Sequence, residues 1–341
     1  MDEFRADVRQ FCAELQVTFR TEMGQELNAS CGLSKSALSR NRRTHIPSPF
    51  IASTWGGMTV AVLSPRECQR TSSLSDWSGA SEKIGWPSIV GQLRSSLQAY
   101  GFDIVQPLCL SWYNDLLPES SGAHISPRGA SGNQTLVVLI GNSKNLWPSF
   151  VAACRQQAGL LTDADPLDTY VEQGVRCATH TVSGHDCRLF WSHLQSDELS
   201  GSKYIAIQRM AHAAGLAVLE QNSHLCVHPK FGPWIALRCA LVFDGVQYTE
   251  PQTVPRMNPL SVSTQQYIQM AMRTALRKPS LNQEDAETSP KPSNAWPKWV
   301  AVRDAICPCH PWRYCEEQLE YHYTKDKSVL ESAVARHCQH R

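Results

Sequence analysis

The segment PWIALRCALVF, residues 233–243, restricts the fold of this chain more than any other stretch. It is long and apolar enough for a buried strand, and successive side chains of a strand point to opposite faces of the sheet. One face would be wholly apolar, with Ile235, Leu237, Cys239, Leu241 and Phe243. The opposite face would carry Arg238 between Ala236 and Ala240. We therefore expect a sheet with a core packed against the apolar face.

Arg238 needs an anion, because a buried guanidinium cannot lose its charge by titration. Two kinds of anion would serve. One is an internal Asp or Glu side chain, and the other is a ligand carboxylate held through two parallel hydrogen bonds. The pattern of the strand by itself favours the internal salt bridge, and a ligand is the alternative.

Other segments predict helices and strands on both sides of this strand. In the first of them, Ile89, Leu93 and Leu97 recur at helical spacing and Gly101 follows as a stop signal. Helices are expected over 88–102, 146–158, 202–221 and 312–323, and strands over 134–142 and 187–194. Such a mixture over about 250 residues is typical of an α/β or α+β domain.

The composition changes sharply along the chain and predicts the domain boundaries. Residues 1–84 form an N-terminal extension that we expect to be mostly disordered, because 28–82 are rich in serine and show little periodicity. A short amphipathic helix is expected within residues 1–20. The core domain would cover 85–335, with a Pro-, Ser- and charge-rich insertion at 252–297 that we also expect to be disordered.

Charge and hydropathy exclude several classes of function. The chain has 32 basic and 31 acidic residues, which argues against a broad surface for nucleic acid. It has no apolar run as long as a membrane span. The acidic residues Asp2, Glu3 and Asp7 are unlike a targeting peptide, so we expect a cytoplasmic protein.

The chain has 13 cysteines at irregular spacing, which predicts reduced thiols and not a disulfide framework. One cluster, CPCHPWRYC at 307–315, could hold zinc through Cys307, Cys309, His310 and Cys315. Zinc sites usually use C-x₂₋₄-C pairs, and no second cysteine pair follows at the usual distance, so structural thiols are favoured over a zinc site.

The stretch AHAAGLA, residues 211–217, consists mostly of small side chains and contains His212. Small residues allow another part of the molecule to approach the backbone closely. The approaching group would be either a second helix or a large flat ligand, and the sequence leaves both open.

Several motifs together resemble one protein family. The segments that carry the resemblance are SWYNDLLPE (111–119), AHAAG (211–215), CVHPKFGPWIALR (226–238), VRDA (302–305) and RYCEEQLEY (313–321). They are similar, in the same order, to W-Y-N-E-L-L-P-P, A-H-V-A-G, C-I-H-P-R-F-G-G-W-F-A-I-R, Y-R-D-A and R-Y-S-E-E-Q-K-A-Y. These motifs belong to the cobalamin-processing proteins of methylmalonic aciduria and homocystinuria type C, which decyanate cyanocobalamin and dealkylate alkylcobalamins.

The resemblance implies an α+β fold of the flavin-nitroreductase type, with a mixed sheet and flanking helices. It implies that cobalamin is bound base-off, without a protein ligand on cobalt. Glutathione would be the co-substrate for dealkylation, and reduced FAD or FMN with NADPH would supply electrons for decyanation. It further implies delivery of the product, with a type D trafficking protein and the methionine synthase system as partners.

The resemblance also implies functional residues. Arg238 and Arg303 match glutathione-binding arginines of the family. The positions assigned to cobalamin binding are Ser192, Ile205, Ala206, Ile207, Gln208, His212, Leu219, Glu220, Cys226 and Leu237. Leu219 and Glu220 stand where the family has a tyrosine-rich stretch, so the pocket for the nucleotide tail is expected to be built differently. The family's third glutathione arginine has no clear counterpart, because Val329 aligns with it and the nearest basic residues are Lys325 and Lys327.

Three other functions remain open from the sequence. The missing third arginine favours a cobalamin carrier without catalytic activity. A flavin nitroreductase with its own FMN would share the same fold. A zinc-binding interaction protein is the third alternative, since it would use the cysteine cluster at 307–315.

Overall fold

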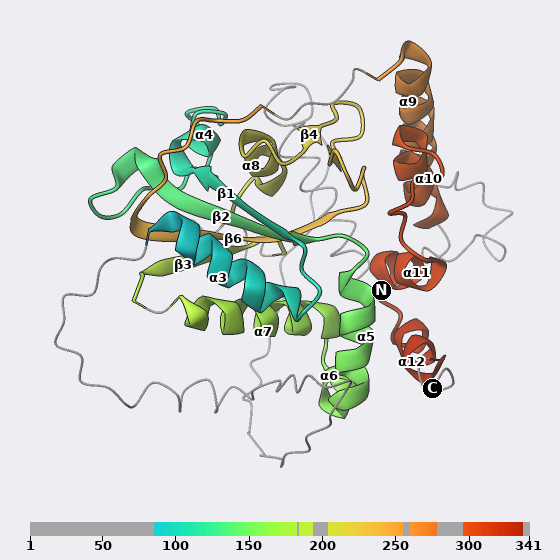
Figure 1. Ribbon diagram of the computed structural model, residues 1–341. Coiled ribbons are helices and arrows are strands. Elements are labelled where there is room, and N and C mark those ends of the chain that lie inside the picture. Colours follow the sequence, from blue (N-terminus) through green and yellow to red (C-terminus); the bar gives the residue numbers. More distant parts are fainter. Residues whose placement is uncertain (1–84, 183, 194–203, 255–259, 278–295, 337–341) are drawn as a thin grey trace, which may run out of the picture. The chain divides into compact units, whose positions relative to one another are not determined.

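The computed structural model describes residues 85–182, 184–193, 204–254, 260–277 and 296–336 (Figure 1). The expected N-terminal extension, with its amphipathic helix, lies outside the described residues.

Four antiparallel strands form the central sheet, in the order β1 (Ile104–Cys109), β2 (Thr135–Asn142), β6 (Ala236–Gln247) and β3 (Cys187–Trp191). The strand expected at 233–243 is β6, and it lies in the middle of the sheet beside β2. Every residue of β2 is buried, so layers cover both faces. All pairs in the described sheet are antiparallel, and the mixed pairing expected from the resemblance is not seen there.

A β-bulge in β6 overturns the expected division of its side chains between the two faces. Ile140 of β2 pairs with Cys239, but the next residue, Gly141, pairs with Leu237, so Arg238 is the extra residue. Beyond the bulge the alternation is inverted. Cys239, Leu241 and Phe243 belong to one core, whereas Ile235 and Leu237 pack with the opposite one, as do Ala240 and Val242. The prediction of a single apolar face was therefore wrong.

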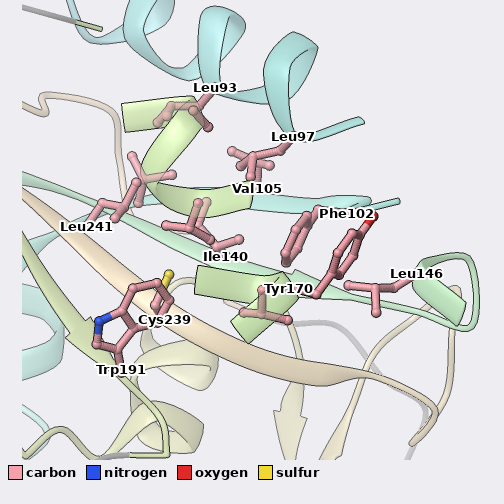
Figure 2. Close-up of a cluster of buried hydrophobic side chains, with 14 of the residues drawn as sticks. Leu93, Leu97, Phe102, Val105, Ile140, Leu146, Tyr170, Trp191, Cys239 and Leu241 are labelled. Carbon is pink, nitrogen blue, oxygen red and sulfur yellow. The ribbon is translucent and has the colours of Figure 1, made fainter. Parts of the chain in front are cut away.

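The first core lies between the sheet and the helices α3 (Trp86–Gln98), α5 (Leu146–Gln156) and α7 (Pro166–Thr181). Figure 2 shows Leu93 and Leu97 of α3 above Val105, Ile140 and Leu241 of the sheet. Leu93 and Leu97 follow the helical spacing that the sequence predicted, and they are buried, as are the three sheet residues. The short helix α6 (Ala158–Thr162) and the last helix, α12 (Lys327–Arg336), complete this side.

The second core covers the other face of the sheet, below α4 (Leu110–Asn114), α8 (Ile207–Ala213) and a small hairpin (Figure 1). The hairpin strands are β4 (Val218–Leu219) and β5 (Cys226–Val227). The helix expected over 202–221 is thus much shorter. It stops after Ala213 because Gly215 has φ +68° and turns the chain into the hairpin.

The remaining helices are α9 (Val262–Leu276), α10 (Trp296–Ile306) and α11 (Glu316–Thr324), and a 3₁₀ turn, η1 (Gly132–Gln134), precedes β2. The insertion expected to be disordered over 252–297 contains α9, which packs on α10 through Ile268 and Met272. Its residues 255–259 and 278–295 lie outside the described part. No helix among the described ranges has the length and hydropathy needed to cross a bilayer.

Candidate functional site

The end of β6 joins two groups of predicted site residues. Leu237 packs against the second core, and the next residue is Arg238. The backbone N–H of Ser192, at the end of β3, donates to the carbonyl oxygen of Arg238 at 2.9 Å. The predicted cobalamin residues Ser192 and Leu237 therefore adjoin the predicted glutathione residue Arg238 through the backbone.

Most of the predicted cobalamin residues come together around α8 and the hairpin. Leu219 pairs with Cys226 across the hairpin, and the Cys226 thiol lies 3.6 Å from the carbonyl oxygen of Gln208. The apolar members all pack in or against the second core, and they are Ile205, Ala206, Ile207, Leu219, Cys226 and Leu237. Segments far apart in the sequence thus form one apolar wall.

Tyr113 and Asn114, from SWYNDLLPE, hold this wall in place. The buried hydroxyl of Tyr113 accepts a hydrogen bond from the N–H of Ala206 and donates one to the carbonyl of Ala123, both at 2.9 Å. The Asn114 amide makes two hydrogen bonds to the backbone of Ile125. Burial raises the pKa of Tyr113 well above its ordinary value, so the phenol stays protonated. The sequence singled out this motif without giving it a role.

Glu220 and His212 have different surroundings. The buried carboxylate of Glu220 accepts four hydrogen bonds from the backbone and side chains of Asn222 and Ser223, which fix the hairpin turn. The Nδ1 atom of His212 is buried and has no hydrogen-bond partner within the described residues. Glu220 therefore shapes the wall through the turn, and His212 retains unused hydrogen-bonding capacity.

The small residues at the end of α8 accommodate a neighbouring segment of the chain. Gly215 leaves no room for a Cβ atom, which would collide with the backbone and side-chain oxygens of Thr253. The side chain of Gln252 donates to the carbonyl of Ala213 at 3.0 Å. Among the described residues, the partner that lies close to this backbone is the segment 252–253, and not the second helix that the sequence left open.

Arg238 has no salt bridge to any of the described residues. Its Nε donates to the Oδ1 of Asn142 at 2.8 Å, and no carboxylate of the described residues lies within 4 Å of the guanidinium nitrogens. Asn142 is itself buried and donates to the carbonyl of Ser143. The internal partner that the strand pattern favoured is therefore absent from the described part of the chain.

Arg303, on α10, is held by its neighbours on several sides. Its Nε donates to the hydroxyl of Tyr323 at 3.0 Å, and another guanidinium nitrogen contacts the carbonyl of Pro233. The guanidinium lies over the buried ring of Trp234, 5.7 Å from its centroid. Trp234 precedes β6, so Arg303 is fixed to the same end of that strand.

Arg238 and Arg303 act electrostatically on the same two side chains, Tyr314 and His322. Burial raises the pKa of Tyr314 to about 12, although both guanidiniums oppose this rise. Burial lowers the pKa of His322 far below its ordinary value, and the charges of Arg303, Lys325 and Arg238 lower it further. His322 is therefore neutral at neutral pH.

Lys325 is the basic residue that joins the two arginines. It ends α11 in a left-handed conformation, with φ +53°, and its Nζ lies 3.2 Å from the Oδ2 of Asp165. Burial raises the pKa of Asp165, but Lys325 and the hydrogen bond from Asp168, with a smaller effect of Arg238, outweigh burial and lower it. We call Arg238, Arg303 and Lys325 the basic cluster.

The other two positions considered for the third arginine lie elsewhere. Val329 packs against the first core, and the Nζ of Lys327 donates to the carbonyl of Asp163 at 2.6 Å. The sequence could not show which of these residues lies near the two arginines, because the position of Lys325 depends on the turn after α11.

The cysteine segment shows no metal-binding geometry. Within the described ranges, no three His, Cys, Asp or Glu side chains are close enough to hold an ion, and the nine cysteines there are free thiols. The Nδ1 of His310 accepts a hydrogen bond from the N–H of Trp312, and burial raises the pKa of Cys307. Neither property favours a zinc ligand.

Comparisons with known proteins agree with these motifs, although no family model matches the chain. The chain is 26% identical over 248 residues to the cyanocobalamin reductase / alkylcobalamin dealkylase of Mus musculus, covering 68% of this chain and 77% of the relative. The Homo sapiens protein of the same name is also 26% identical, with 68% and 76% covered. The Danio rerio protein is 29% identical over 188 residues, with 49% and 68% covered.

The fold has a counterpart among solved structures. The C. elegans B12-trafficking protein CblC, described as a human MMACHC homologue, superposes with a TM-score of 0.52 at 18% identity. The match covers 72% of this chain and 96% of that protein. In both its sequence relatives and its fold, this chain is therefore similar to the proteins of the MMACHC-like family.

Proposed function

We propose that this chain is a cytosolic cobalamin-processing enzyme that removes the upper ligand of its substrate. The observation that carries the proposal is the junction at the end of β6. Leu237 belongs to the apolar wall, and Arg238 belongs to the basic cluster. The two features that the reaction needs, a surface for cobalamin and a site for an anionic thiol, are therefore neighbours.

The apolar wall around α8 and the hairpin would receive the nucleotide tail of base-off cobalamin. Its predicted members are mostly aliphatic, and the Gln208 backbone and Cys226 thiol add polar groups. His228 and His310 each use Nδ1 to accept backbone N–H groups, which leaves Nε2 protonated. Neither of these two rings then has a free nitrogen lone pair for cobalt.

The basic cluster would hold the two carboxylates of glutathione. A guanidinium binds a carboxylate through charge-assisted hydrogen bonds, and the nearby positive charges also favour a thiolate over a thiol. The thiolate attacks the alkyl carbon on cobalt, a carbon–sulfur bond forms, and both electrons of the carbon–cobalt bond stay on the metal. The products are a thioether and cob(I)alamin, and the thiol proton goes to solvent.

Decyanation needs electrons and not a nucleophile. Reduced FAD or FMN, with NADPH as the source, would supply them when bound, and cyanide would leave the reduced cobalt. The chain's own part is to bind cobalamin base-off at the apolar wall, because loss of the lower ligand makes cobalt easier to reduce. The product would then pass to the methionine synthase system with a type D trafficking partner.

Anaerobic mixing of the purified chain with methylcobalamin and glutathione tests the proposal. We expect an optical shift to base-off cobalamin on binding, followed by the spectrum of cob(I)alamin and formation of S-methylglutathione. A base-off shift without either product would identify a cobalamin carrier. A chain that retains FMN and leaves the cobalamin spectrum unchanged would identify a flavin nitroreductase.

A further inference from the structure

Two buried hydrogen-bond donors lie beside the basic cluster without a partner. The hydroxyl of Tyr314 and the Nε1 of Trp234 make no hydrogen bond within the described part of the chain. Tyr314 is 3% exposed and Trp234 is 0% exposed. Their rings lie 5.5 Å apart. Buried polar groups in proteins are nearly always paired, so two unpaired donors in contact call for an acceptor.

The neighbours of these donors are cationic. Arg303 lies over one side of the contact, 5.7 Å from the Trp234 centroid, and the charges of Arg303 and Arg238 both reach Tyr314. Arg313 also lies over the indole, at 5.6 Å. Its charge is already neutralised by Asp304 at 3.2 Å and Glu316 at 2.6 Å. Arg238, by contrast, has no ion pair among the described residues.

The position of Tyr314 is fixed by packing. Its ring packs with Trp234, Val300 and Leu319 in a separate small core, and it meets the ring of His322 edge to face at 6.1 Å. It directly precedes Cys315, the N-terminal cap of α11. A phenol held this rigidly loses little conformational entropy when its hydroxyl binds a ligand.

We propose that the hydroxyl of Tyr314 donates a hydrogen bond to a carboxylate of the thiol substrate and is a specificity-determining contact of the basic cluster. The inference rests on the proposed function and adds a residue that the motifs did not assign. A neutral donor can bind a carboxylate here without adding to the mutual repulsion of Arg238 and Arg303. Tyr314 thus adds a contact to the chain's two matched arginines without adding charge.

The substitution Tyr314→Phe tests the inference, because it removes one oxygen and keeps the ring. We expect the KM for glutathione to rise about tenfold, the size of one hydrogen bond to a charged group. We expect kcat to change little and the melting temperature to stay level or rise, since the hydroxyl has no partner to lose. Tyr113→Phe is the matched control: its hydroxyl has two partners, so its melting temperature should fall.

Binding of S-methylglutathione to the full chain, followed by calorimetry, separates this inference from the proposed function. This thioether keeps both carboxylates and cannot react. Weaker binding to Tyr314→Phe than to the unsubstituted chain supports the inference, even if the chain proves to be a carrier. Equal binding, or no binding to either protein, overturns it. A fall in the melting temperature of Tyr314→Phe also overturns it, because the hydroxyl would then have an internal partner.

Discussion

At the scale of single residues, Arg238 decides how the basic cluster is interpreted. The guanidinium has a hydrogen bond to Asn142 and no ion pair in the described part of the chain. Removing it would leave one amide oxygen unpaired, which costs about 1–3 kcal/mol. Breaking a buried salt bridge would cost about 3–5 kcal/mol. The two interpretations therefore differ in stability as well as in activity.

We expect Arg238→Ala to stay folded and to raise the KM for glutathione about ten- to hundredfold, through loss of a charge-assisted contact. Arg238→Lys should restore only part of the affinity, since an ammonium lacks the planar fork. Arg176→Ala is a suitable control, because this exposed arginine pairs with Glu172 on the surface of α7. If the KM for glutathione is unchanged in Arg238→Ala, Arg238 does not contact glutathione.

His228 predicts a dependence of stability on pH. Burial lowers its pKa to about 4, helped by Lys230 and opposed by Asp103. Between pH 6.5 and about 4 the unfolded chain binds a proton here and the folded chain does not. Stability should therefore be retained above pH 6.5 and decrease as the pH falls toward 4. Each such group contributes at most about 1.4 kcal/mol per pH unit, and less where water screens it.

Urea unfolding at several pH values measures this effect. The variant His228→Asn keeps an acceptor for the two backbone N–H groups but has no titrating ring. We expect its stability to depend less on pH than that of the unsubstituted chain between pH 6.5 and 4. Parallel curves for the two proteins would show that His228 contributes nothing. His322 and His310, whose pKa values burial also lowers, would keep some dependence in both.

At the scale of elements, the bulge in β6 depends on one glycine of β2. A Cβ atom on Gly141 would lie 2.7 Å from the backbone oxygen of Ala236, closer than real contacts allow. We expect Gly141→Ala to destabilise the fold by about 1–3 kcal/mol, because the two strands must separate there. Gly91→Ala in α3 is the control. It meets no atom within 4 Å, and it should be neutral or stabilising by roughly 0.5–1 kcal/mol.

Chemical denaturation of both glycine variants measures these changes, and glutathione binding shows whether Arg238 has moved. A Gly141→Ala protein as stable as the unsubstituted chain would mean that the bulge adapts without cost. The sequence predicted β6 as a strand but not the bulge, because the cause lies in its partner strand. It predicted α8 but not its end, because the segment that crosses Gly215 comes from 252–253.

At the scale of the whole molecule, the sheet, both of its covering layers and the described site residues are built from residues 85–336. We expect a chain lacking residues 1–80 to fold and to bind cobalamin with little loss, because a serine-rich segment buries little apolar surface. Melting temperature and cobalamin titration of the truncated and full chains test this. An insoluble truncated chain, or one that melts far lower, would make the extension part of the core.

The candidate site could be predicted only in pieces. Motif resemblance singled out Arg238, Arg303 and the residues of the apolar wall, because they lie within or next to short recognisable segments. It could not bring Tyr314, His322 and Lys325 to the arginines, because that contact depends on how α10 and α11 pack at the end of β6. Local patterns determine which elements form, whereas long-range packing determines which side chains meet.

The junction of Leu237 and Arg238 has a thermodynamic consequence for the two predicted ligands. One peptide bond separates the residue expected to meet cobalamin from the residue expected to meet the thiol, and Ser192 is tied to the same carbonyl. A backbone shift caused by either ligand therefore reaches the place of the other. If binding of the thiol changes the dissociation constant of cobalamin by some factor, binding of cobalamin must change the dissociation constant of the thiol by the same factor. The order in which the two molecules bind then decides which binary complex forms first, but the total free energy of forming the ternary complex is the same for both orders.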